Sequence, residues 1–375
     1  MSKKLIIKGG KLLDLHSGFK YESRDLLVED GIIKKIGEDI EAEGAEYLKL
    51  NGEIITPGFI DVHTHVYTGN TSLGINADTV GVNTGTTTVF DAGSSGAANF
   101  QDFRSKVIEK SETRVIALLN VASQGLAAGL SELTDLKNID FEAIKETVQK
   151  NQDIIKGIKA RASASVVGQL GIKPIETAKD IAVRLGLPLV VHIGNYPPAI
   201  EDVLAIMQKG DVITHCYHGK PNGLLKADGS IKEETLRAID RGVIFDVGHG
   251  TASFNFITAK RAMKQGFYPS SISTDIYIKN YKGPVHSLAV TMSKLLNLGL
   301  SLEECVTKVT TIPMESFKLK KIGAIKEGYF ADFTIVNVKD APVKYIDSDG
   351  NILEGNKAIE VVYSIRSGVV KRLVF

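Results

Sequence analysis

The sequence predicts an α/β protein: a (β/α)8 TIM barrel with a small β-sandwich domain built from both ends of the chain. Three observations lead to this prediction. Short apolar, β-branched runs alternate with helix-prone stretches between residues 59 and 276. Eight such runs can be counted, which is the number a closed parallel barrel needs. Polar residues lie at the C-terminal ends of several runs, where barrel enzymes carry their active sites.

Both ends of the chain show the sequence pattern of short strands. Apolar and polar residues alternate there, and Gly-containing turns interrupt the alternation. The segments concerned are residues 5–14, 25–39 and 45–58 at one end, and 331–340, 358–368 and 369–375 at the other. We therefore expect residues 1–55 and 321–375 to form the β-sandwich together, and residues 56–320 to form the barrel.

The barrel strands are expected at eight places. They are residues 59–66, 87–92, 114–121, 154–159, 188–193, 211–216, 242–247 and 271–276. Helix-prone, amphipathic stretches such as residues 100–110 and 201–210 lie between them. A doubly wound open sheet is the alternative, but the count of eight and the polar strand ends favour the barrel.

Composition and net charge favour a soluble protein that acts on a small molecule. Of the 375 residues, 43% are hydrophobic and 24% are charged, as in ordinary soluble proteins. A net charge of +1 gives no reason to expect nucleic acid or an anionic membrane as a partner. Cys216 and Cys305 make no disulfide framework, and no signal peptide or membrane span is evident. We expect a cytoplasmic protein acting on a small molecule, with a homo-oligomer left open.

His63 and His65 are the first candidates for metal ligands. Alternate residues of a strand point to the same side, so both imidazoles lie on one face of the strand and can bind the same metal ion. A lone His in a strand is more often structural, but four of the eight His residues lie at strand ends, His192 and His215 being the others. Asp61 shares the face of His63 and is expected either to orient that ring or to be buried in the barrel.

Two motifs resemble a known family. PGFIDVHTH at residues 57–65 and the Gly328–Val336 segment, GYFADFTIV, are similar to motifs of the amidohydrolase superfamily of metal-dependent hydrolases. The resemblance extends over nearly the whole chain. It is greatest to dihydroorotase-like binuclear members, and within these to a deacetylase-like group whose members are also labelled adenine deaminase or dihydroorotase.

The resemblance implies a set of ligands for two divalent ions, with zinc expected. His63 and His65 would hold the more buried ion, and His192 and His215 the second. Lys159 would bridge both, which requires N6-carboxylation because an ammonium has no lone pair to give. Asp275 would complete the set at the end of the eighth strand.

Lys156 competes with Lys159 for the bridging role. Lys159 lies nearer the C-terminal end of its strand, where the other candidates are, and has apolar neighbours on both sides. Lys159 is therefore the better candidate. The common alternative for any lysine is a solvated surface position.

The implied chemistry is hydrolysis. Two cations would lower the pKa of a shared water to give a bridging hydroxide and would polarise a substrate carbonyl. Asp275 would accept the proton of that hydroxide and deliver it to the leaving group. An aspartate at such a place is otherwise a turn or helix-capping residue.

Substrate contacts are expected from the loops after the strands. The singled-out residues are Arg161, Tyr196, His218 and Lys279; further loop candidates are Tyr67, Gln124, Asn195, Lys220, His249 and Tyr277. Arg161 shares a strand face with Lys159 and could pair with a substrate carboxylate through its planar fork. Cys216 follows a ligand candidate, so we expect it to face away from the metals and pack in the core.

These observations predict a binuclear hydrolase of a small, carboxylate-bearing amide or ester. The alternatives are a nucleobase (adenine) deaminase, a cyclic amide hydrolase of the dihydroorotase type, and a non-enzymatic scaffold. Every expected ligand position is occupied in this sequence, which argues against the scaffold.

Overall fold

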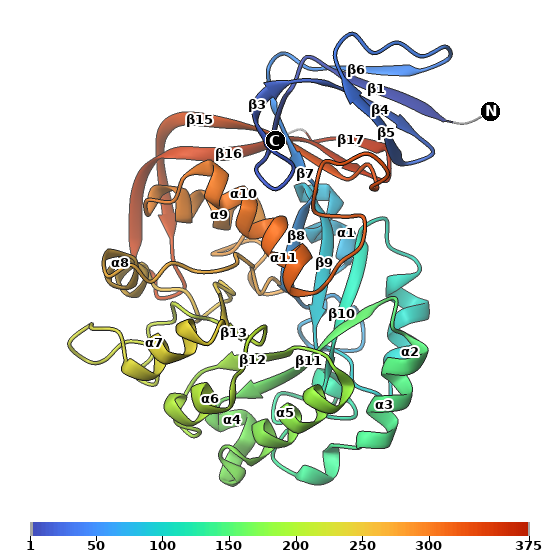
Figure 1. Cartoon of the computed structure of the whole chain (residues 1–375). Coiled ribbons are helices and arrows are strands. Elements are labelled where there is room, and N and C mark those ends of the chain that lie inside the picture. The colour runs from blue at the N-terminus through green and yellow to red at the C-terminus, as the bar shows by residue number, and fades with distance from the viewer. Residues whose placement is uncertain (1–2, 374–375) are drawn as a thin grey trace.

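The computed structural model describes residues 3–373, which form three β-sheets with helices packed around the largest (Figure 1). The last two residues of the expected strand 369–375 lie outside the described part of the chain. The largest sheet has seven parallel strands in the order β14-β13-β12-β11-β10-β9-β8. Its strands are β8 (Phe59–Thr64), β9 (Thr86–Ala92), β10 (Arg114–Asn120), β11 (Ile155–Ala162), β12 (Leu189–Ile193), β13 (Val212–Thr214) and β14 (Ile244–Asp246).

The expected eighth strand is the exception. Residues 271–276 make one parallel bridge from Ser271 to Asp246 of β14 and another from Ile276 to Thr64 of β8. They occupy the eighth position and join the two edges of the sheet, so the barrel prediction holds. The prediction of a regular strand there was wrong, since Ser273 and Thr274 use their side chains as well as their backbone to contact neighbouring strands.

Helices follow the barrel strands and cover the sheet. They are α1 (Ala77–Val80), α2 (Phe100–Phe103), α3 (Phe141–Lys150), α4 (Ala164–Val167), α5 (Lys173–Leu185), α6 (Ile200–Ile206), α7 (Glu233–Asp240), α8 (Phe256–Lys264), α9 (Leu288–Asn297), α10 (Leu302–Val309) and α11 (Thr311–Ser316). The helix expected at 100–110 is α2 continued by a π-helix to Ile108, and the helix expected at 201–210 is α6. Helix α5 is typical: Ile175, Ala178 and Ile181 are buried on one side, so the apolar stripe drives its packing.

The chain ends form the two smaller sheets. One has the order β5-β4-β1-β6, and the other, β17-β16-β15-β7-β2-β3, combines strands from both ends. The strands are β1 (Lys4–Lys8), β2 (Lys11–Asp14), β3 (Phe19–Ser23), β4 (Asp25–Glu29), β5 (Ile32–Gly37), β6 (Glu46–Lys49), β7 (Ile54–Pro57), β15 (Phe333–Ile346), β16 (Ile352–Arg366) and β17 (Val369–Arg372). Buried side chains from both ends, including Leu12, Val28 and Phe333, share one apolar cluster. The boundaries after residues 55 and 320 stay predictions.

A long hairpin made of β15 and β16 runs from the β-sandwich down the side of the barrel (Figure 1). It packs on α9, where the side chain of Asn297 bonds the backbone of Asn356 and Lys357. At the hairpin tip the hydroxyl of Ser348 donates to the carbonyls of His249 and Gly250, 3.1 and 2.9 Å away. The hairpin therefore supports a loop that follows β14 at the C-terminal end of the barrel.

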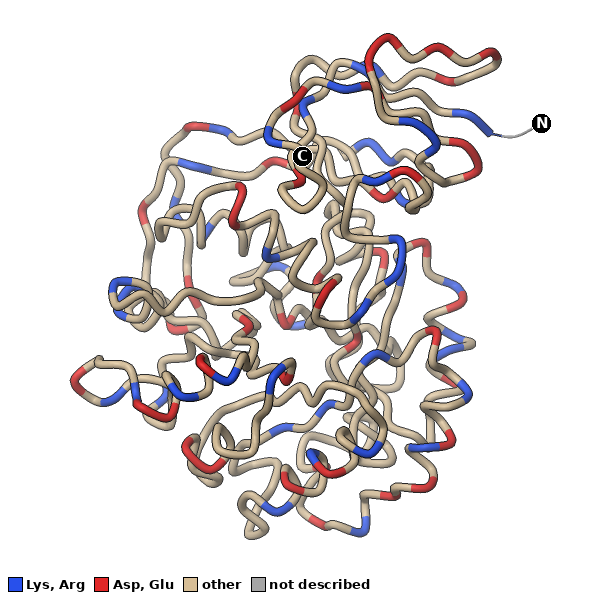
Figure 2. The backbone as a smooth tube through the Cα atoms, in the orientation of Figure 1, with Lys and Arg blue, Asp and Glu red and all other residues tan. Residues whose placement is uncertain are grey.

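Lys and Arg alternate with Asp and Glu over the whole trace, without an extended region of one sign (Figure 2). This agrees with the net charge of +1. Within residues 3–373, no helix has the length and apolar character needed to cross a membrane.

Candidate metal centre

The six expected ligand residues meet at the C-terminal end of the barrel strands. His63 lies in β8 and His65 one residue beyond it, Lys159 lies in β11, and His192 lies in β12. His215 follows β13, and Asp275 belongs to the eighth segment. All come from different positions around the barrel except the first pair, so the closure of the barrel is what assembles them.

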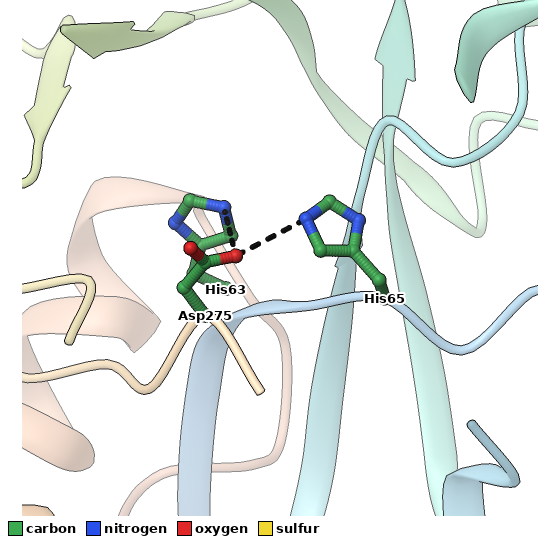
Figure 3. Close-up of side chains that lie close together, drawn as sticks. All are labelled: His63, His65 and Asp275. Carbon is green, nitrogen blue, oxygen red and sulfur yellow. Dashed lines mark ion pairs between the residues drawn. The ribbon is translucent and has the colours of Figure 1, made fainter. Parts of the chain in front are cut away.

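Asp275 is the centre of the cluster. Its Oδ1 lies 3.3 Å from Nε2 of His63 and 3.2 Å from Nε2 of His65, and Figure 3 shows the carboxylate facing both rings. Its Oδ2 lies 4.0 Å from Nε2 of His215. The ligand atoms of His63, His65 and Asp275 are all within 4.8 Å of one another, close enough to share one metal ion.

Lys159 and His192 lie beside two different rings of this cluster. Nζ of Lys159 lies 3.4 Å from Nε2 of His63, and Nδ1 of His192 lies 2.7 Å from Nε2 of His215. His192 is partly exposed, whereas the other three His rings are buried. Lys156 lies near the opposite end of β11, and its ammonium donates to the carbonyl of Gln152. Of the two lysines, Lys159 is thus the one that reaches the cluster.

Hydrogen bonds behind the rings fix which nitrogen is free to bind metal. The hydroxyl of Thr214 donates to Asp246, so it must accept from Nδ1 of His63, 3.0 Å away. Nδ1 of His215 donates to the carbonyl of Gly248 at 2.6 Å, because a carbonyl can only accept. In both rings Nε2 therefore carries the lone pair, as metal ligation requires; that of His63 lies beside Asp275 and that of His215 lies beside Nδ1 of His192.

Electrostatics favour uncharged nitrogen donors. Burial, together with the charge of Lys159, lowers the pKa of His63 well below its ordinary value. Burial lowers the pKa of His215 to about 4 and the pKa of Lys159 to about 8. Within the described residues Lys159 has no carboxylate partner within ion-pair distance, although it is 1% exposed. Neutral imidazoles and a carboxylate are a donor set that fits divalent metal.

The backbone at the centre is held in unusual conformations. His215 has φ +76° and Asp275 has φ +47°, a region that side-chain-bearing residues rarely adopt and that is found at functional sites. Gly250 approaches Asp275 so closely that a Cβ there would lie 2.6 Å from Oδ2. Only glycine fits beside this carboxylate.

Sequence reasoning missed the residues behind the ligands. Asp246 is buried and accepts from the hydroxyls of Thr214, Ser271 and Ser273, while Ser94 contacts Nδ1 of His65 at 3.0 Å. No local motif marks these positions, since their partners are far away in the sequence. Only their places at strand ends could have suggested them.

Asp61 connects the first strand to the eighth segment. It accepts from the backbone N–H of His63 and from both the N–H and the hydroxyl of Thr274. Burial raises the pKa of Asp61 to about 7. The expectation that it is buried in the barrel agrees with its 1% exposure.

The residues predicted to contact the substrate differ in their exposure to solvent. Tyr196 is 70% exposed and Lys279 is also exposed, whereas His218 is buried. Arg161 donates from Nε and Nη2 to both oxygens of Glu132, at 2.7 and 2.6 Å. Its planar fork is therefore already paired with a carboxylate of the protein. The substrate roles of these residues stay predictions.

Two other loop candidates contact protein groups. His249 is buried, and its Nε2 accepts from Nζ of Lys294, which also donates to the carbonyls of Pro284 and Ile346. Tyr277 lies beside the ring of His65 and shares a hydrogen bond with Thr251. Cys216 is buried in the barrel core, as expected.

Known proteins resemble the chain over its full length. It is 39% identical over 345 residues to a deacetylase of Brucella anthropi, covering 91% of this chain and 86% of that protein. It is 37% identical over 374 residues to a deacetylase of Enterococcus faecalis, covering 99% of both. A crystal structure described as an adenine deaminase superposes with a TM-score of 0.94 at 36% identity, covering 99% of this chain and 100% of that one. A crystal structure described as a dihydroorotase superposes with a TM-score of 0.92 at 35% identity, covering 99% of this chain and 98% of that one.

The amidohydrolase family model matches residues 54–370, which include the barrel and the strands that return to the β-sandwich. This match, the relatives that share more than a third of their residues with the chain, and the cluster of His63, His65 and Asp275 agree with one another. The chain therefore belongs to the amidohydrolase family and is a hydrolase.

Proposed function

We propose that the chain is a binuclear metal-dependent hydrolase that cleaves the amide or ester bond of a small acylated acid. One observation supports the proposal: Asp275 has three imidazole nitrogens within 4.0 Å, and Lys159 and His192 each lie beside one of these rings. A deacetylase name on the curated relatives supports an acyl carbon as the point of attack.

Two groups of ligands are proposed. His63, His65 and Asp275 would hold one ion, and His192 and His215 the other. Lys159 would bridge them as a carbamate, formed when its neutral amine attacks the carbon of CO2 and releases a proton. Its burial and its lack of a carboxylate partner support an amine that can be neutral. When bound, two divalent ions, with zinc expected, supply a water of lowered pKa and an electrophile for the substrate carbonyl.

Asp275 is proposed as the general acid and base. Its two oxygens face different His residues, so one carboxylate reaches the whole cluster. It would take the proton of the attacking water and pass it to the leaving nitrogen or oxygen as the acyl bond breaks. Gly250 leaves room for the carboxylate in this position, because a Cβ there would lie 2.6 Å from Oδ2. Such positioning is what proton transfer in the transition state requires.

Deamination and cyclic amide hydrolysis are the competing functions. They are favoured by the names on the two superposing structures, an adenine deaminase and a dihydroorotase. A centre that binds two ions around a lysine bridge suits attack on an acyl carbon, and we therefore place attack on the adenine ring second. A cyclic amide also has an acyl carbon, and we place its hydrolysis second because the curated relatives are named deacetylases.

A substrate panel tests the proposal. Zinc-loaded protein should release acid from N-acyl amino acids or O-acyl hydroxy acids, contain about two divalent ions per chain, and leave adenine and dihydroorotate unchanged. Asp275→Asn is the matched control for contaminating hydrolases. Ammonia release from adenine without any acyl hydrolysis, or a consistent content of one ion, would contradict the proposal.

A further inference from the structure

His218 is a buried side chain with an unused hydrogen-bond donor. The residue lies just beyond β13, where its N–H donates to the carbonyl of His215, and it is 3% exposed. Its Nδ1 accepts from the backbone N–H of Lys220 at 3.1 Å. Because a backbone amide can only donate, Nδ1 carries the lone pair and Nε2 carries the proton. Within the described residues, Nε2 has no hydrogen-bond partner.

The ring of His218 lines a cavity of about 240 Å³, here called the His218 cavity. Three cationic side chains line it as well: Lys220, Lys226 and Arg261. No Asp or Glu is among its lining residues. Buried donors are almost always paired in native structures, so an unpaired N–H beside three cations indicates a missing acceptor with negative charge.

Lys220 is the cation best placed to meet such a group. It is half-buried, and its ammonium has neither a hydrogen bond nor an ion pair within residues 3–373. Lys226 and Arg261 are exposed and lie at the rim. The Nε2–H of His218 is therefore the donor at this site, and Lys220 supplies the positive charge.

The His218 cavity adjoins the metal centre. The backbone N–H of His218 donates to the carbonyl of His215 at 3.2 Å, so the two residues are in direct contact. His218 also follows His215 by only three residues. A volume of this size suits one acid group with a short carbon chain, as a part of a larger site.

We propose that the His218 cavity binds the acid group of the substrate, with Nε2–H of His218 donating to one carboxylate oxygen and the ammonium of Lys220 pairing with the other. This proposal rests on the proposed function, since it places the acyl carbonyl of the same molecule at the metal centre. It assigns the carboxylate to Lys220 in place of Arg161, whose fork is held by Glu132. His218 and Lys220 determine which substrate binds and take no part in proton transfer.

Binding is tested first, without any turnover. Propionate and its neutral isostere propionamide are titrated into zinc-loaded protein while the imidazole N–H signals are followed by NMR. Propionate should shift the Nε2–H signal of His218 and saturate, and propionamide, which has no charge to pair with Lys220, should bind roughly tenfold more weakly or worse. Lys220→Met should weaken propionate binding roughly tenfold or more, as expected for loss of a charged partner. The exposed Lys282→Met is the control and should bind as wild type does.

Kinetics provides the second test. For an acylated acid, kcat/KM should fall roughly tenfold or more in Lys220→Met and His218→Phe. For the corresponding carboxamide, the loss in Lys220→Met should be much smaller, because a neutral amide has no charge to pair with the ammonium. His218→Gln should recover part of the loss, because its side-chain amide also carries an N–H.

Equal propionate affinity in wild type and Lys220→Met would overturn the proposal, and so would equal losses for the acid and the carboxamide. If wild type hydrolyses no acyl compound, the proposed function fails, yet the propionate titration still decides whether the cavity binds acids. Lys220→Met keeps the test informative if His218→Phe does not fold.

Discussion

Replacing Thr214 by valine should weaken metal binding without disturbing the fold. The residue is buried at the end of β13, and valine has nearly the same shape and suits a buried strand. Its hydroxyl accepts from Nδ1 of His63 and donates to Asp246, so it holds the proton of His63 on the nitrogen that faces away from Asp275. Without the hydroxyl, the proton of His63 has no preferred nitrogen and can occupy Nε2.

The size of the effect follows from these two hydrogen bonds. Loss of a partner that orients a metal-binding His lowers metal affinity roughly 10- to 100-fold, which corresponds to about 1.4 to 2.7 kcal/mol. The free energy of unfolding of the metal-free protein should fall by about 1 to 3 kcal/mol for the lost hydrogen bonds, and the fold should persist because Asp246 keeps its bonds from Ser271 and Ser273.

Competition with a chromophoric zinc chelator measures the affinity, and urea unfolding of the metal-free protein measures the stability. Thr86→Val is the matched control: this buried strand hydroxyl has no hydrogen-bond partner within the described residues. It should leave metal affinity unchanged and stability equal or higher. A Thr214→Val protein that binds zinc as tightly as wild type would refute the reasoning about the His63 proton.

Three further predictions concern lysines and the carboxylate. Lys159→Ala should lose metal and activity together, with partial recovery in a short carboxylic acid, while Lys156→Ala stays active; the reverse result would assign the bridge to Lys156. Asp275→Asn should lower turnover by roughly two to four orders of magnitude and change metal content far less, and normal turnover would make Asp275 structural. Burial lowers the pKa of Lys294 from 10.5 to about 7, so the unfolded chain binds that proton more tightly in this window. The free energy of unfolding of wild type relative to Lys294→Met should therefore rise from pH 7 toward pH 10.5 and be lost as the pH falls through 7; a difference that does not vary with pH would contradict the shift.

The sequence predicted that the candidate ligands meet at one end of the barrel because barrel geometry is regular, whereas their individual roles came from the family resemblance. A run of β-branched residues marks a strand, and its last residues must face the same end of a parallel barrel. Period-two alternation then pairs His63 with His65, and the structure brings both to one carboxylate. The same argument selects Lys159, which reaches His63, over Lys156, which does not.

Residues behind the ligands could not be predicted in this way. Thr214 acts on His63, 151 positions away, and nothing in its local sequence distinguishes it from other strand threonines. The contacts of loop side chains are equally difficult to predict from the sequence, because they depend on packing that hydrophobic periodicity does not describe. Arg161 is an example. Its guanidinium group could pair with a substrate carboxylate, but it is paired with Glu132, and nothing in the sequence around Glu132 indicates this contact.

The eighth segment explains why its location was predictable and its conformation was not. A regular strand would have placed Asp275 in extended backbone, whereas its φ is +47°. Carboxylates of neighbouring strands compensate for the missing ladder: Asp246 accepts from Ser271 and Ser273, and Asp61 accepts twice from Thr274. Since side chains rather than a β-ladder hold the segment, its last residues can leave strand geometry and turn the Asp275 carboxylate toward the His rings. The irregularity of this segment is therefore a condition for forming the centre.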